Sequence, residues 1–370
     1  MSTVYKGTPL HIDDSTNIRL LKILPTDDET TPITCTIRVV ALEGSPKYTA
    51  LSYEWGPPQP TKKILLNGEP FIIRENLWNF LNQARRYRKS WEFWIDAICI
   101  DQISDAERTH QVSMMGKIYS IAELAVAWLG TAILDTPEWL SLLEEIPDIH
   151  LYRACSDSVD WCRRYRDCIS YLCSLSYWSR IWIVQEYVLS QKVIIWIGRH
   201  HTTGENMERL RAMCKMVPGQ YSALIGVETP AMQILQHRRN RTDVRARGRS
   251  YSLILENVVL EFAGSKCVDP RDHVYALLSL CDPLEVTEAS ITPDYSKSTL
   301  EIYIQLLRRA EKSLVESGRS IYEDEVSETK TYMGKLRSLL GVELEEFQNM
   351  DPEITKLLTK NSYIFSNYPD

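Results

Sequence analysis

Apolar residues in the first two hundred positions form short continuous runs that alternate with stripes at helical spacing. Such runs are typical of buried strands, whereas recurrence every three or four residues is typical of amphipathic helices. The sequence therefore predicts strands at residues 48–56, 93–100, 125–130 and 192–198, and a helix-rich segment at residues 139–190. Two further predicted helices have stripes at Leu77, Phe80, Leu81, Ala84 and Tyr87, and at Val112, Met115, Ile118, Tyr119 and Ala122.

Two local signals mark where elements turn or begin. Asn67-Gly68 lies between apolar runs and is a strong signal for a two-residue turn, so residues 64–73 are predicted to form a β-hairpin. Ser104 and Glu107 have the S-x-x-E spacing of a capping box at the start of a helix. Strands that alternate with helices in this way predict an α/β fold, a parallel sheet with helices on both faces.

The second half of the chain has a different pattern. From about residue 204 it is mostly helical, and from residue 318 it is acidic and weakly patterned. The expected organisation is an α/β domain at residues 1–203 with its core at 48–198, and a helical C-terminal extension packed on it at residues 204–317. An acidic tail at residues 318–370 is expected to be either loosely ordered or a helical cap.

Composition and charge fit a globular protein. Of the 370 residues, 44% are hydrophobic and 25% are charged. No run of about 18 apolar residues occurs and the first residues lack a secretion signal, so we expect a cytoplasmic protein without a membrane span. The net charge of −7 disfavours nucleic-acid binding as the main task.

One stretch departs from this acidic balance. Residues 237–249 (HRRNRTDVRARGR) contain six arginines. The stretch is either a solvated helix or loop whose arginines pair with acidic neighbours, or a patch that binds RNA or phosphate. The absence of interleaved aromatic residues weakens the second interpretation.

Several familiar signatures of functional sites are missing. The nine cysteines are odd in number and form no C-x-x-C pair, so neither a disulfide framework nor a metal site is expected. No G-x-G-x-x-G follows a strand and no phosphate-binding G-x-x-x-x-G-K-[ST] loop occurs, which argues against conventional dinucleotide oxidoreductases and NTPases. The G-x-S-x-G elbow and the H-E-x-x-H helix are also absent.

Two carboxylates stand beside an apolar run where ligands of α/β proteins bind. Asp96 and Asp101 flank the residues AICI at the end of the second predicted strand. An isolated buried carboxylate is costly, so each must have a partner or face a cleft. The candidate partners are Arg74, Gln102, Arg108 and Arg180, and an internal salt bridge remains an alternative.

A third carboxylate lies in the apolar stretch 177–190 (YWSRIWIVQEYVLS). If this stretch is one helix, Glu186 shares a face with Trp178, Trp182, Gln185 and Leu189. Desolvation perturbs the pKa of such a glutamate, which makes it a candidate functional group. The alternative is a structural glutamate paired with Arg180 or Arg199.

These segments resemble the heterokaryon-incompatibility (HET) domain of fungal proteins. Downstream, DPRDHVYALLSL at residues 269–280 and ITPDYSKS at residues 291–298 resemble the segment that commonly follows this domain. The resemblance covers residues 48–198 and continues to about residue 300. The matching stretches are YTALSYEWG, the Asn67-Gly68 hairpin, ENLWNFL, FWIDAICIDQ, AERTHQVSMMGKIYSIAELAVAWLG and YWSRIWIVQE.

The resemblance implies a TIR/flavodoxin-like fold and a role in fungal self/non-self recognition and programmed cell death. TIR domains, of which HET domains are held to be distant relatives, often cleave the nicotinamide–ribose bond of NAD+ with a glutamate in a W-x-x-x-E element. Trp182 and Glu186 have that spacing, which implies an NAD+ glycohydrolase with Glu186 as its catalytic residue. The residues expected to bind the nucleotide are Tyr53, Trp55, Asp96, Asp101, Arg108, Arg180, Trp182 and Gln185.

Other functions stay open at this point. The domain is alternatively a non-enzymatic signalling module that acts by self-association or partner binding, or a base-exchange or cyclising nucleotide enzyme in a specialised pathway. A nucleic-acid role through residues 237–249 is less favoured. We expect NAD+ as a substrate with no metal or other cofactor, and a homo-oligomer or a protein partner in incompatibility signalling.

Overall fold

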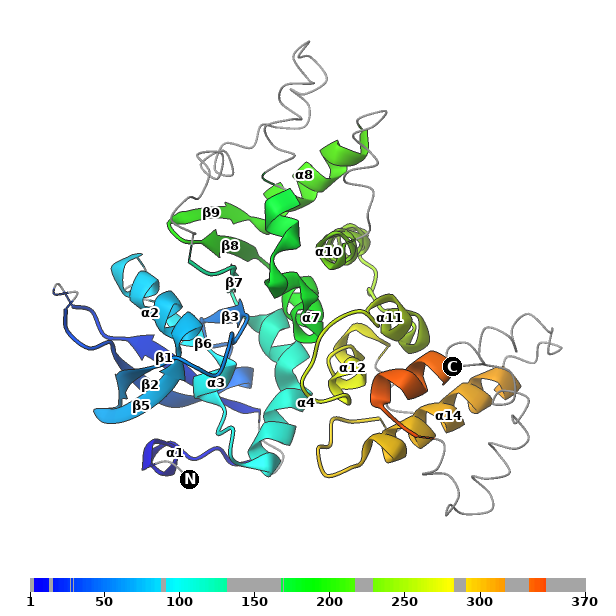
Figure 1. The fold of residues 1–370 in the computed structure, drawn as a ribbon, viewed down its shortest axis with the longest axis horizontal. Coiled ribbons are helices and arrows are strands. Elements are labelled where there is room, and N and C mark those ends of the chain that lie inside the picture. The colour runs from blue at the N-terminus through cyan, green and yellow to red at the C-terminus, as the bar shows by residue number, and fades with distance from the viewer. Residues whose placement is uncertain are drawn as a thin grey trace, which may run out of the picture. The chain divides into compact units, whose positions relative to one another are not determined.

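The computed structural model describes residues 3–12, 16–26, 28, 30–87, 91–131, 168, 170–216, 229–282, 291–316 and 333–343 (Figure 1). The chain divides into two compact units, Met1–Tyr251 and Ser252–Asp370. Most of the segment expected to be helix-rich and most of the acidic tail lie outside the described residues. The domain boundaries expected at residues 203 and 317 stay predictions.

The first unit is built on a nine-stranded mixed sheet with helices beside it, which confirms the α/β class (Figure 1). Strands β6, β3, β7 and β8 are parallel neighbours in that spatial order. If these four strands are numbered by their sequence order, the spatial order is 2-1-3-4, as in flavodoxin-like sheets. The full order is β5-β4-β2-β1-β6-β3-β7-β8-β9. The strands are β1 (Asn17–Ile23), β2 (Thr34–Ala41), β3 (Thr49–Tyr53), β4 (Thr61–Leu66), β5 (Glu69–Arg74), β6 (Glu92–Trp94), β7 (Leu124–Trp128), β8 (Val193–Ile197) and β9 (His200–Thr203).

Three strands of this sheet were not expected from the sequence. β1 and β2 form an antiparallel pair that extends the sheet beyond β6, and β9 adds an antiparallel strand beside β8. β1 is buried at five of its seven positions, so its side chains show no alternation of polar and apolar residues. That burial on both faces removes the period-two signal by which a strand is recognised in a sequence.

The expected hairpin is present as β4 and β5. Asn67 and Gly68 form its turn with positive φ angles of 51° and 83°, which is the backbone geometry that Asn-Gly adopts in two-residue hairpins. The Asn67 Oδ1 atom accepts a hydrogen bond from the Ile37 amide at 3.0 Å. The turn residue therefore also ties the hairpin to β2.

Helices cover both faces of the central strands. On one face, Phe80 of α2 (Glu75–Tyr87) contacts the rings of Phe93, Trp128 and Trp196 edge-on. On the other face, α4 (Asp105–Ile121) places Tyr119 against Trp94, whose side chain points away from that of its neighbour Phe93. Helix α7 (Ile181–Leu189) packs beside α4 and β3 on this second face.

Two expected elements are broken in the structure. The strand expected at residues 93–100 ends at Trp94, where its pairing with β3 stops, and the chain turns into the short helix α3 (Asp96–Cys99). The helix expected at residues 177–190 is a 3-10 turn, η3 (Ser176–Ser179), followed by α7. Between them Arg180 is extended (φ −80°, ψ 134°), and its guanidinium donates to the backbone carbonyl of Tyr53.

The first unit has four further helices among its described residues. They are α1 (Thr3–Gly7), η1 (Leu42–Gly44), α8 (Gly204–Met216) and α10 (Pro230–Ala246). The second unit is helical over its described residues, as expected, with α11 (Leu255–Glu261), α12 (Asp272–Tyr275), η4 (Leu278–Leu280) and α14 (Thr299–Glu316). Within the described ranges, no helix has the length and apolar character needed to cross a membrane.

The two sequence motifs of the second unit bind each other. Arg271 of DPRDHVYALLSL donates to the carbonyls of Tyr295 and Lys297 in ITPDYSKS at 2.9 and 2.5 Å, and pairs with Asp269. The Tyr295 hydroxyl donates back to Asp272 at 2.7 Å. One guanidinium thus serves two backbone acceptors and one carboxylate, an arrangement that suits the planar arginine fork.

We expect Arg271→Lys to loosen this unit by about 1–3 kcal/mol, because one ammonium group cannot serve all these acceptors at once. Hydrogen exchange of the amides at residues 294–298 should accelerate in the variant. The matched control is Arg247→Lys, which changes an exposed arginine at the end of α10. Equal protection of residues 294–298 in both variants would refute the assignment.

Candidate functional site

Five of the expected site residues meet where the parallel strands end. Tyr53 and Trp55 follow β3, Asp96 follows β6, and Arg180 and Glu186 belong to the start and the body of α7. In open α/β sheets this edge is the usual place for a ligand. We call Tyr53, Trp55, Asp96, Arg180 and Glu186 the strand-end cluster.

Glu186 is buried, with 2% of its surface exposed. Its Oε2 atom accepts a hydrogen bond from the Ser52 hydroxyl at 2.5 Å, and Ser52 Oγ lies 2.8 Å from the Tyr177 hydroxyl. Burial raises the pKa of Glu186 to about 7, although Arg180 and the hydrogen bond from Ser52 favour the charged form and oppose the rise. No described residue forms an ion pair with this carboxylate.

Asp96 is more accessible than Glu186. It is half-buried, and its Oδ2 atom accepts a hydrogen bond from the Trp55 indole at 2.8 Å. Desolvation raises the pKa of Asp96, while Arg180 and the hydrogen bond from Trp55 act in the opposite direction. The cluster therefore has one deeply buried carboxylate and one that still reaches the surface.

Arg180 provides positive charge near both of these acids. It is half-buried, and it lowers the pKa of both Asp96 and Glu186 without forming an ion pair with either. Its guanidinium donates to the Tyr53 carbonyl, which fixes it at the end of β3. The buried Tyr53 phenol has a strongly raised pKa, chiefly because of desolvation and also because of Asp96, and is therefore neutral.

Arg74 and Asn76 hold the turn that carries Trp55. Arg74 donates to the Gly56 carbonyl at 2.7 Å, and its guanidinium stacks 5.1 Å from the centre of a Trp55 ring. Asn76 donates to the Glu54 carbonyl and accepts from the Trp128 indole at 3.0 Å. The start of α2 thus binds the loop after β3 and the last residue of β7.

The expected W-x-x-x-E pair lies one turn apart on α7. Trp182 is half-buried and precedes Glu186 by one helical turn. Gln185 is 1% exposed, and its Nε2 atom has no hydrogen-bond partner among the described residues. Arg199 is exposed on the turn between β8 and β9. The structural alternative that paired Glu186 with Arg180 or Arg199 is therefore not observed.

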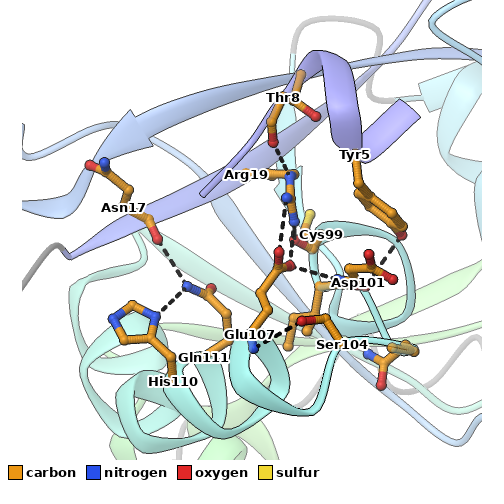
Figure 2. A network of polar contacts seen from close by, with 12 residues as sticks. Tyr5, Thr8, Asn17, Arg19, Cys99, Asp101, Ser104, Glu107, His110 and Gln111 are labelled. Atoms are coloured by element: carbon orange, nitrogen blue, oxygen red, sulfur yellow. Dashed lines mark hydrogen bonds and ion pairs between the residues drawn. The ribbon is translucent and has the colours of Figure 1, made fainter. Parts of the chain in front are cut away.

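Two expected site residues lie in a different set of contacts. Asp101 is 1% exposed and donates its backbone amide to Glu107 at 2.6 Å, within the polar network shown in Figure 2. Arg108 forms a helical ion pair with Asp105 at 2.9 Å. The structure does not bring either residue into the strand-end cluster, and their expected role in nucleotide binding has no geometric support.

Two of the six arginines at residues 237–249 have a structural task at the end of α7. Arg238 is buried, pairs with Glu208 at 3.1 Å, and donates to the carbonyls of Tyr187 and Ser190 at 3.0 and 2.6 Å. Arg241 donates to the Val188 carbonyl at 3.2 Å. These guanidinium groups satisfy the carbonyls that a helix end leaves open. They stabilise the helix that carries Glu186.

Sequence reasoning missed the hydroxyl groups around Glu186. Ser52 lies inside a buried strand, and Tyr119 and Tyr177 sit in apolar stripes that read as ordinary core. The available signal was Ser52 itself, since a hydroxyl in a run buried on both faces needs a partner. Within the described residues, no group of three or more histidine, cysteine, aspartate or glutamate side chains is arranged to hold a metal ion.

The stretch that supplies the strand-end cluster matches a known family. Residues 48–186 match the family model of the heterokaryon incompatibility protein (HET). The chain carries a HET domain. The match begins just before β3 and ends at Glu186, so it contains all five cluster residues.

A curated relative extends this similarity beyond the HET domain. The chain is 27% identical over 354 residues to "Heterokaryon incompatibility protein 6, OR allele" of Neurospora crassa, an alignment that covers 80% of this chain and 52% of the relative. The chain thus spans about half the length of that relative. No solved structure matched the chain. The distant similarity of the HET domain to TIR domains stays a prediction.

The raised pKa of Glu186 makes stability depend on pH in a defined direction. An acid with a higher pKa in the folded state than in the unfolded chain binds more protons when folded, so stability falls as pH rises from about 4.5 to about 7. The loss contributed by Glu186 is on the order of 3 kcal/mol at most.

Replacement of Glu186 by glutamine should remove this loss. Urea unfolding at pH 5 and pH 8 should show a smaller decrease in the free energy of unfolding for Glu186→Gln than for the wild type. At pH 8 the variant should be the more stable protein. If both proteins lose the same stability between the two pH values, Glu186 does not titrate in this range.

Proposed function

We propose that the HET domain binds NAD+ or a related nucleotide at the strand-end cluster and cleaves its nicotinamide–ribose bond with the aid of Glu186. In the wider biology, the protein would act in fungal self/non-self recognition, as the name of its relative suggests. The observation that carries the proposal is Glu186, a buried carboxylate that accepts a hydrogen bond from Ser52 and has no ion pair among the described residues, beside a half-buried acid, indole and guanidinium.

The reaction needs what this cluster offers. As the bond between ribose C1′ and the nicotinamide nitrogen breaks, its electron pair goes to nicotinamide, which leaves as a neutral base, and positive charge develops on the ribose. A carboxylate facing that charge stabilises the transition state, as in glycosidases. Water then adds to C1′ and releases a proton. A cation that neutralised Glu186 in an ion pair would weaken this effect, and none is present among the described residues.

The surrounding groups suit the rest of a nucleotide. Asp96 is half-buried and can accept hydrogen bonds from ribose hydroxyls. Trp55 and Trp182 are half-buried aromatic surfaces for a base, and Arg180 carries the positive charge that a pyrophosphate requires. Because Glu186 is 2% exposed, substrate contact requires movement of side chains above it.

That burial also supports a second candidate function. A carboxylate sealed under Ser52 and Tyr177 suits a module that signals by self-association or partner binding without chemistry. In this case the raised pKa of Glu186 reflects only the cost of its burial. A base-exchange or cyclising reaction would use the same cluster with another acceptor, and its products would differ from ADP-ribose.

The decisive experiment follows nicotinamide release from NAD+ by the purified protein at concentrations that span self-association. We expect release by the wild type and a loss of at least about 100-fold in Glu186→Gln, because the neutral amide cannot offset the ribose charge. Asp96→Asn should raise KM more than it lowers kcat.

Glu92→Gln is the matched control, since it removes a carboxylate that pairs with Arg38 outside the cluster. It should retain wild-type activity. No release at any concentration, together with unchanged assembly of Glu186→Gln, would favour the non-enzymatic module.

The pH dependence of cleavage provides an independent check. Glu186 must be ionised to act, so kcat/KM should rise with pH through an inflection near pH 7. Ser52→Ala removes a hydrogen bond that favours the charged form, and the inflection should move to higher pH. Ser174→Ala, which loses an exposed hydroxyl bonded to the Tyr171 carbonyl, should leave it in place. An inflection that stays near pH 7 in Ser52→Ala would argue against Glu186 as the titrating group.

A further inference from the structure

The backbone just beyond Asp96 is bound by side chains of three other elements. The carbonyls of Ile98 and Ile100 lie 3.0 and 3.3 Å from the Tyr5 hydroxyl, which donates to them. The Cys99 carbonyl accepts from Arg19 at 3.0 Å, and the Asp101 amide donates to Glu107 at 2.6 Å. Each of four consecutive residues therefore has a backbone group bound to a side chain of α1, β1 or α4.

These side chains form one buried unit, the Arg19 clamp, which consists of Tyr5, Arg19 and Glu107 (Figure 2). Arg19 and Glu107 pair through two contacts of 2.5 and 3.1 Å, and their exposures are 1% and 5%. The Arg19 guanidinium also donates through Nε to the Thr8 carbonyl at 2.7 Å and lies 4.7 Å from the centre of the Tyr5 ring. With every partner fixed, the clamp is a rigid support.

The clamp is connected to Asp96 by only one helical turn. Asp96 is the first residue of α3, and its carbonyl accepts from the Ile100 amide at 3.3 Å and from the Gln102 side chain at 2.9 Å. A shift of residues 98–101 would therefore move the Asp96 backbone. The Asp96 carboxylate would then change its distance from the Trp55 indole, its partner at 2.8 Å.

We propose that Tyr5 and Arg19 are positioning residues that set the Asp96 carboxylate in the strand-end cluster through α3. The assignment of a binding role to Asp96 rests on the proposed function, whereas the mechanical link does not. Tyr5 and Arg19 both lie outside residues 48–186, so the site depends on sequence beyond the HET family match.

The Trp55 indole N–H is a direct reporter of this link. In protein labelled with 15N-tryptophan, Trp55→Phe assigns its signal among the ten tryptophans. We expect Tyr5→Phe and Arg19→Lys to shift or broaden the Trp55 signal and to speed exchange of the amides at residues 97–103 about tenfold. The control is Tyr48→Phe, which loses a buried hydroxyl bonded to the Ile118 carbonyl at 2.6 Å and should leave both readouts unchanged.

Activity supplies a second readout with a distinct pattern. In Tyr5→Phe, KM for NAD+ should rise several-fold with little change in kcat, because a displaced Asp96 weakens binding of the substrate. If the wild type neither binds nor cleaves NAD+, the proposed function fails, and the indole signal still decides the positioning. An unchanged Trp55 signal and unchanged exchange in both folded variants would overturn the inference.

Discussion

The HET domain is organised around one constraint, the burial of the Glu186 carboxylate. This carboxylate lies among hydroxyl groups and has no ion pair among the described residues. Desolvation disfavours the charged form of Glu186. Hydrogen bonds favour it, and so does the positive charge of Arg180, which forms no ion pair with Glu186. The Ser52 hydroxyl of β3 donates directly to Glu186, Tyr119 of α4 also favours the charged form, and Tyr177 of η3 binds the Ser52 hydroxyl. The packing of α4 and α7 on this face of the sheet is thus tied to the chemical state of one side chain.

The domain holds a second buried glutamate in the opposite way. Glu107 has a bidentate partner in Arg19 and accepts a backbone amide, so its charge is fully compensated. Breaking such a pair by removal of one partner costs about 3–5 kcal/mol, whereas Glu186 has no such partner to lose. A glutamate that is paired with an arginine stabilises the fold. A glutamate without an ion pair remains available for interaction with a developing positive charge. This contrast, more than burial alone, separates the two glutamates.

The sequence predicted the elements that carry strong local signals. The Asn67-Gly68 turn and the Ser104 cap are observed, because both depend on interactions within a few residues. The partner of Glu107 was not predictable. Its capping-box carboxylate is taken by Arg19, a contact across 88 positions. Asp96 and Asp101 looked equivalent on the two sides of the apolar run AICI. The turn into α3 separates them, so that Asp96 joins the cluster and the Asp101 amide binds Glu107 of the clamp.

Support for the cluster also comes from residues beyond the HET family match. Arg238 and Arg241 of α10 bind the last carbonyls of α7, and Arg19 of β1 pairs with Glu107 of α4. A fragment limited to residues 48–186 would leave Glu107 without its cation and would end at Glu186, before the last residues of α7. A buried charge without a partner and an open helix end each destabilise a fold. The unit that can hold the strand-end cluster in place must therefore run at least from β1 to α10.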